Sequence, residues 1–197
     1  MSILDQDITT YVLKWEGVEN IAFKLKAKIE KESGEEIGNI ETKGLFTKKI
    51  FLKDLNKSVL LKAVKSGVGI VAKYNVYDAD DNKIAVIKQK LFSRKKIMIM
   101  KNSKDEEILK FEGSSFLKGN HQINFPNGEN LAVFSRKQDV VKTGKWKSKL
   151  FSTCTLQIKK PDFDRKILLA MFISCLSSYV DYTETEFQSD YVKYFRK

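Results

Sequence analysis

The sequence predicts a mainly β protein, a closed barrel of about twelve antiparallel strands around a central hydrophobic C-terminal helix. Three observations predict this fold: an internal repeat of 47 residues, short strands within each copy, and a C-terminal stretch that is apolar on every face. Hydrophobic residues make up 42% of the 197 residues and charged residues 31%, which is typical of a folded globular domain. A chain of this length has room for one hydrophobic core.

The repeat appears when the sequence is shifted by 47 residues. Residues 37–40 (Ile-Gly-Asn-Ile) then fall on residues 84–87 (Ile-Ala-Val-Ile) and on residues 131–134 (Leu-Ala-Val-Phe). In the same register, Lys43 falls on Lys90. A common register through three copies indicates one structural unit used three times.

Each copy predicts four short strands joined by tight turns. In the second copy, residues 70–77 and 83–90 flank the turn-forming run Asp80-Asp81-Asn82. Gly34 and Gly128 occupy the same place in the first and third copies, and Asn-Gly at the third is a strong hairpin signal. Three copies of four strands give about twelve, and sheets with so many strands usually curl or close.

The C-terminal region changes to a helical pattern. Asp162 or Asp164 can cap a helix that runs from about residue 165 to residue 180. Residues 167–176 are apolar all round, so such a helix must be buried on every face, and a twelve-stranded barrel is wide enough to hold it. The alternative is a helix on the protein surface or in a membrane, although a bilayer needs about 20 apolar residues.

No group of residues indicates catalysis, and we expect neither an enzyme nor a bound cofactor or metal. With a single histidine, His121, a Ser-His or Cys-His site has only one candidate base. Asp78, Asp80 and Asn82 resemble the start of a calcium loop, but Lys83 and Gln89 replace the glycine and glutamate that such a loop requires, so a turn is the better interpretation.

Cysteine usage and the N-terminus bear on the location of the protein. Cys154 and Cys175 are 21 residues apart and form no CxxC pair, and residues 1–10 lack the features of a signal peptide. We therefore expect a cytoplasmic protein.

Four segments resemble proteins of the LURP-one-related family: residues 75–93, 108–113, 131–137 and 164–174. The resemblance covers roughly residues 20–180, and its most specific piece is Lys88-Gln89-Lys90-Leu91-Phe92-Ser93. These proteins are similar in fold to the tubby C-terminal domain, which binds phosphoinositides, and to the phospholipid scramblases. The resemblance implies one tubby-like barrel domain over residues 1–180 with the helix at its centre. Residues 181–197 form an additional tail, which we expect to be helical.

The charges separate between the two ends of such a barrel. The chain carries a net charge of +11, and alternating strands place successive turns on opposite ends. Turn segments of one end sum to −8 (residues 30–36, 54–57, 78–83, 103–107 and 126–129), and those of the other end sum to +13 (residues 43–49, 62–66, 90–96, 112–116 and 136–149). A concentrated positive surface attracts anionic lipid headgroups or nucleic acid.

We therefore expect a non-enzymatic module that binds anionic phospholipid headgroups through its basic end, peripherally at the inner face of the membrane. The expected headgroup contacts are Lys48, Lys49, Lys90, Arg94, Lys95 and Lys96, with Phe92 and Trp146 as apolar anchors. One alternative is that these lysines only keep the protein in solution. The chain would then be a protein-interaction scaffold that uses its acidic end or its tail. Nonspecific binding of nucleic acid is a further alternative.

Overall fold

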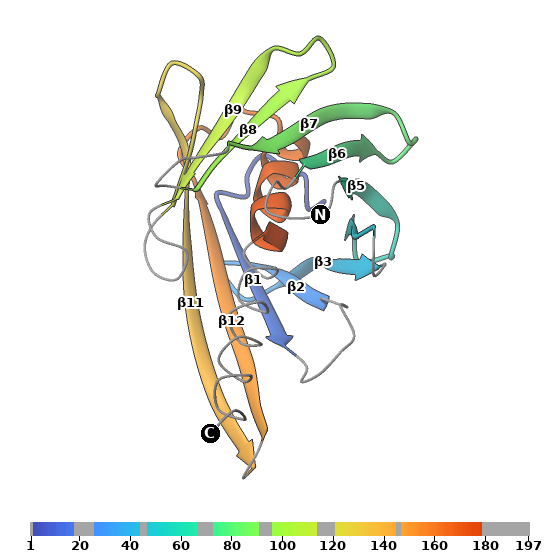
Figure 1. The fold of residues 1–197 in the computed structure, drawn as a ribbon. Helices are drawn as coiled ribbons and strands as arrows, with labels where there is room; N and C mark the ends of the chain where they lie inside the picture. The colour runs from blue at the N-terminus through green and yellow to red at the C-terminus, as the bar shows by residue number, and fades with distance from the viewer. Residues whose placement is uncertain are drawn as a thin grey trace, which may run out of the picture.

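The computed structural model describes residues 2–17, 26–43, 47–66, 73–90, 96–113, 121–144 and 147–178. These residues form twelve strands and one helix, residues 165–178, which we call the central helix (Figure 1). The strands are β1 (Thr10–Gly17), β2 (Lys26–Lys31), β3 (Glu36–Lys43), β4 (Lys49–Lys53), β5 (Val59–Ser66), β6 (Lys73–Asp78), β7 (Lys83–Gln89), β8 (Lys96–Asn102), β9 (Glu107–Gly113), β10 (His121–Asn124), β11 (Asn130–Gly144) and β12 (Lys147–Ile158).

The strands form a closed antiparallel barrel, as the sequence predicts. Each strand pairs with its neighbours in the chain, and β1 pairs with β12 from Thr10 opposite Gln157 to Gly17 opposite Leu150. Alternation along the strands supplies the inner wall: in β2, Ala27 and Ile29 are buried while Lys26 and Lys28 are exposed. The inner faces of all the strands therefore share one core.

The central helix fills this core (Figure 1). It begins after Asp164, whose Oδ1 accepts hydrogen bonds from the backbone N–H groups of Lys166 (2.7 Å) and Ile167 (3.4 Å), so Asp164 rather than Asp162 is the cap. Residues 168–178 are buried, and the Phe172 ring packs edge-on against Phe134 at 5.1 Å. The predicted buried helix is confirmed. Among the described residues, no helix is long and apolar enough to cross a membrane.

Five hairpin turns of one shape lie at one end of the barrel, which we call the acidic end. In each, the fourth residue of the turn has a positive φ: Gly34 (86°), Lys57 (66°), Asp81 (63°), Asp105 (64°) and Gly128 (88°). Each turn also repeats the same two backbone hydrogen bonds, such as Asp78 N–H to Asn82 O and Asp81 N–H to Asp78 O. Residues 34, 81 and 128 are 47 positions apart, so the sequence repeat is also a repeat in the structure.

The prediction of four strands in every copy is wrong for the third copy. Two long strands, β11 and β12, follow β10 there, and the twelfth strand is β1, which precedes the first copy. Beyond the end of β1, β11 and β12 project from the barrel (Figure 1). Residues 62–66, in β5, and most of residues 136–149, in β11 and β12, lie in strands, although the sequence predicts turns for both segments.

The N-terminal segment, residues 2–9, covers the start of the central helix. Ile3 and Ile8 are buried, and the guanidinium of Arg165 donates to the backbone oxygens of Gln6 (2.7 Å) and Ile8 (3.2 Å). The hydroxyl of Tyr11 donates to Ile3 O at 2.8 Å, and burial raises the pKa of Tyr11 to about 12. These contacts attach the N-terminal segment to both the barrel wall and the helix.

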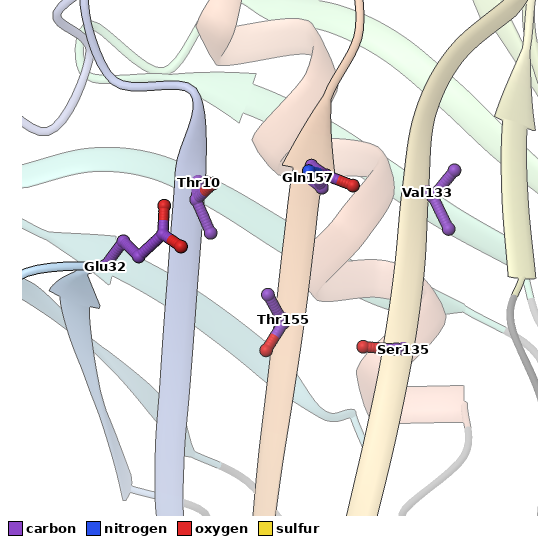
Figure 2. Close-up of a pocket in the computed structure, with 6 residues that line it drawn as sticks. All are labelled: Thr10, Glu32, Val133, Ser135, Thr155 and Gln157. Atoms are coloured by element: carbon purple, nitrogen blue, oxygen red, sulfur yellow. The ribbon is translucent and has the colours of Figure 1, made fainter.

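The outer wall is hollowed where β1, β12 and β11 run side by side. A cavity of about 260 Å³ lies there, which we call the wall cavity (Figure 2). Its lining consists of Thr10, Glu32, Val133, Ser135, Thr155 and Gln157.

Candidate basic site

The described part of the predicted lipid site lies on the wall near the end opposite the acidic end, which we call the basic end. Lys49, at the start of β4, and Lys90, directly after β7, are exposed. Lys48, in contrast, is buried at 7% exposure. Phe92, Arg94, Lys95 and Trp146 lie outside the described residues, as does the side chain of Lys96.

Strand alternation turns further lysines outward beside these. Lys43, Lys73 and Lys88 each adjoin a buried residue on the same strand (Thr42, Tyr74 and Ile87), so each lysine projects from the outer wall. Together with Lys49 and Lys90 they form a basic collar near the basic end. The prediction from sequence did not include Lys43, Lys73 and Lys88 among the contacts. Their outward position beside a strand end is the feature that places them in the basic collar.

Lysines of the basic collar oppose one another directly. In the register of β3 and β4, Lys43 is opposite Lys49, and in the register of β6 and β7, Lys73 is opposite Lys88. Like charges placed directly opposite on neighbouring strands are destabilising. Strand pairing thus produces two local concentrations of positive charge on one side of the barrel.

Few carboxylates offset this charge. Glu41 on β3 accepts a hydrogen bond from Lys53 (2.5 Å), which holds the pKa of its carboxyl below the ordinary value, and its Oε1 lies 3.8 Å from Lys43 Nζ. The sequence has no Asp or Glu from residue 82 to residue 104, the stretch that contains β7 and β8. The basic collar therefore keeps a positive excess.

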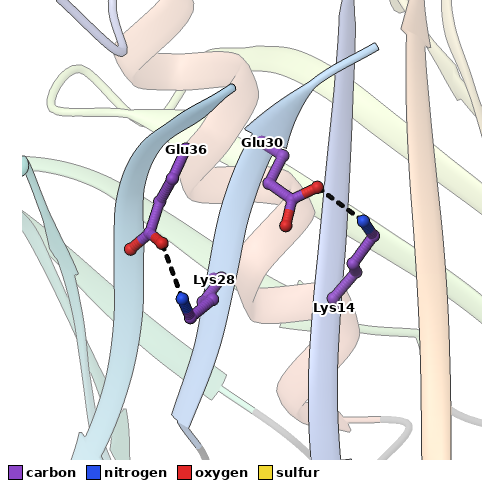
Figure 3. A network of polar contacts seen from close by, with 4 residues as sticks. All are labelled: Lys14, Lys28, Glu30 and Glu36. Carbon is purple, nitrogen blue, oxygen red and sulfur yellow. Dashed lines mark hydrogen bonds and ion pairs between the residues drawn. The ribbon is translucent and has the colours of Figure 1, made fainter. Parts of the chain in front are cut away.

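The wall on the other side of β3 shows how this protein balances charge elsewhere. Lys14 Nζ on β1 lies 2.6 Å from a carboxylate oxygen of Glu30 on β2, and Lys28 Nζ lies 2.8 Å from one of Glu36 on β3 (Figure 3). Both of these outward lysines have a carboxylate on the next strand. The opposed lysines of the basic collar depart from this pattern.

An aromatic side chain lies beside the basic collar. The Phe51 ring, on the outer face of β4, has Lys43 Nζ at 5.7 Å and Lys53 Nζ at 6.0 Å from its centroid. Phe51 thus places a partly buried aromatic group next to cations, the combination that suits a headgroup interface. The predicted anchors Phe92 and Trp146 cannot be compared with it, because they lie outside the described residues.

Other residues singled out in the sequence have structural positions. His121 is buried on β10 between the rings of Phe111 (5.5 Å) and Phe134 (5.2 Å). Asp78 Oδ1 accepts hydrogen bonds from the N–H groups of Asp80 (3.0 Å) and Asn82 (2.9 Å), which makes the Asp-rich run a turn, as predicted. Burial raises the pKa of the Cys154 thiol.

Comparisons with known proteins agree with the barrel. Searches against curated proteins and against solved structures found no match. The family model described as LURP-one-related matches residues 18–175, which include every strand after β1 and most of the central helix. The chain belongs to the LURP-one-related family.

Proposed function

We propose that this protein is a non-enzymatic binding module that recognises anionic phospholipid headgroups through the basic collar. The observation that carries the proposal is the direct opposition of Lys43 with Lys49 and of Lys73 with Lys88. Such pairs reduce stability in the free protein, and an anion placed between them removes the repulsion. A phosphate-bearing surface supplies anions of this kind.

The attraction between lysines and an anionic membrane makes the five lysines of the basic collar sufficient for peripheral binding. Each basic residue near an anionic membrane surface contributes about 1 kcal/mol of binding free energy. The five lysines of the basic collar can therefore hold the protein peripherally at an anionic surface, with Phe51 beside them. The inner face of the cell membrane is such a surface, which fits a cytoplasmic protein, and a protein partner at the membrane is compatible with this role.

Co-sedimentation with liposomes tests the proposal. The vesicles are neutral phosphatidylcholine alone, or phosphatidylcholine with phosphatidylserine or a phosphoinositide, each at low and physiological salt. The double variant K73E/K88E should bind anionic vesicles at least about tenfold more weakly than wild type, because two attractions become repulsions. The matched control K83E/K104E changes the net charge equally, but through exposed lysines at the acidic end.

Each result has a definite meaning. A selective loss in K73E/K88E supports the proposal, and the charge reversal K95E/K96E should then weaken binding as well. Equal losses in K73E/K88E and K83E/K104E would contradict a defined site. Binding that physiological salt abolishes for every headgroup, and for DNA alike, would indicate only nonspecific electrostatics. No binding under any condition would favour a protein-interaction scaffold.

A further inference from the structure

The wall cavity offers a second binding site, on a different part of the barrel from the basic collar. Strand register sets its floor: Thr10 and Val133 both lie opposite Gln157, and Thr155 lies opposite Ser135 one row further along. These side chains face outward, because their strand neighbours Tyr11, Phe134 and Leu156 are buried in the core. The cavity is therefore formed by the outer wall and does not open into the core.

Three hydroxyl groups in the wall cavity have no hydrogen-bond partner among the described residues. Gln157 Oε1 accepts a hydrogen bond from Lys159 Nζ at 3.1 Å. Within the described part of the chain, the hydroxyls of Thr10, Ser135 and Thr155 make no hydrogen bond, although Thr10 is only 9% exposed. Three hydroxyl oxygens can consequently accept hydrogen bonds from a ligand.

A carboxylate lies at the rim of the same cavity. Residues 30–36 of the β2–β3 hairpin carry four glutamates, and three of them pair with lysine: Glu30 with Lys14, Glu35 with Lys31 and Glu36 with Lys28. Glu32 is the fourth, and it has no ion pair with any described residue. Its carboxylate reaches across to Thr10 (Figure 2). Glu41, the remaining glutamate of this hairpin, pairs with Lys53, so among the described residues Glu32 is the hairpin glutamate without an ion pair, and it lies at the cavity.

We propose that the wall cavity binds a guanidinium group, with Glu32 as its charge partner. A guanidinium has five N–H donors and no acceptor, which matches a site made of one carboxylate and three hydroxyl oxygens. The carboxylate can accept two parallel hydrogen bonds from it. The volume of about 260 Å³ is below the roughly 300–1,000 Å³ of drug-sized pockets, so it suits one amino-acid side chain. The source is either free arginine or an arginine side chain of a protein partner.

Backbone-amide NMR of the full chain tests this proposal. The probes are N-acetyl-arginine amide and its citrulline counterpart, which has nearly the same shape but no charge. Saturable shifts at Thr10, Glu32, Ser135 and Thr155 with the arginine probe, and none with the citrulline probe, are expected. A glycine-flanked arginine tripeptide and free arginine then separate the sources, because tighter binding of the tripeptide indicates a protein partner and tighter binding of free arginine indicates the metabolite.

Two variants sharpen the test. Glu32→Gln should weaken binding of the arginine probe on the order of tenfold, because it removes a charged hydrogen-bond acceptor. Glu35→Gln in the same turn is the matched control and should leave the affinity unchanged, because Glu35 pairs with Lys31. Equal affinity for both probes, or an unchanged affinity in Glu32→Gln, would overturn the proposal. Both of these results would leave the proposed lipid binding by the basic collar unaffected.

Discussion

Lys73 and Lys88 show what a single residue contributes to this barrel. Both side chains project from the outer wall, where they cover no core, and their direct opposition places two positive charges side by side. Lys28, on another strand of the same wall, faces the carboxylate of Glu36 instead. The same residue type therefore stabilises the barrel at one position and destabilises it at another.

Replacing one of the opposed lysines should stabilise the free protein. We expect Lys88→Gln to raise the free energy of unfolding by about 0.2–0.5 kcal/mol at low salt, and the gain should disappear at about 1 M salt. Urea denaturation at the two salt concentrations measures this. Lys28→Gln is the control and should lower stability slightly at low salt, because it removes an attractive pair. Equal destabilisation by Lys88→Gln and Lys28→Gln would contradict a repulsion between Lys73 and Lys88.

For single residues, the sequence predicts only in part which lysines the wall exposes. Lys48 and Lys49 look equivalent as neighbours in a basic run, yet Lys49 is exposed and Lys48 is buried. The difference depends on where β4 begins and on which face of that strand is inward, and composition does not contain that information. Lys73 is the opposite case. It stands alone in the sequence and acquires its basic neighbour Lys88 only through strand pairing.

The repeated turn is the element that most directly links sequence to fold. Gly34, Asp81 and Gly128 occupy one position of the repeat and share a positive φ, a conformation that glycine adopts without strain. At Asp81 the strain is offset by the hydrogen bonds of Asp78, which order the same turn. Equivalent turns thus adopt the same conformation either with glycine at the positive-φ position or with side-chain hydrogen bonds that offset the strain.

Substitutions at these equivalent positions should change stability by different amounts. Gly128→Ala should cost about 1 kcal/mol, because alanine is strained at a φ of 88°. Asp81→Gly should change stability little, because relief of the strained position is offset by loss of the ion pair between Asp81 and Lys62. Thermal unfolding followed by circular dichroism compares the two variants. Gly128→Asn provides a check, since asparagine tolerates this region and should lose less than alanine.

The repeat also explains why the sequence does not predict β1 or the full length of β11. It places turns correctly wherever Gly or Asp marks them, but nothing in the repeat reveals that β11 continues without a break to Gly144. The strand β1 was missed because it precedes the first copy and has no counterpart to align with. Its place in the barrel is determined by its pairing with β12, a contact between the two most distant strands in the sequence.

For the whole molecule, the central helix supplies the side chains that fill the interior of the barrel. Phe172 is 1% exposed and packs against Phe134, so it links the helix to the wall. Phe172→Ala should lower the free energy of unfolding by about 3–5 kcal/mol through the cavity it leaves. Lys166→Ala, on an exposed position of the same helix, should change it little. A small loss for Phe172→Ala in urea denaturation would contradict a helix that fills the core.

Closure of the barrel also orders the events of its biosynthesis. Because β1 pairs with β12 and the central helix follows β12, the first strand of the barrel cannot complete its pairing and packing until the last strand and the helix that covers its inner face have been synthesised. Until then the apolar inner faces of the earlier strands stay exposed, and exposed apolar surface promotes aggregation and chaperone binding. The native core can therefore be completed only once residue 178 has been synthesised.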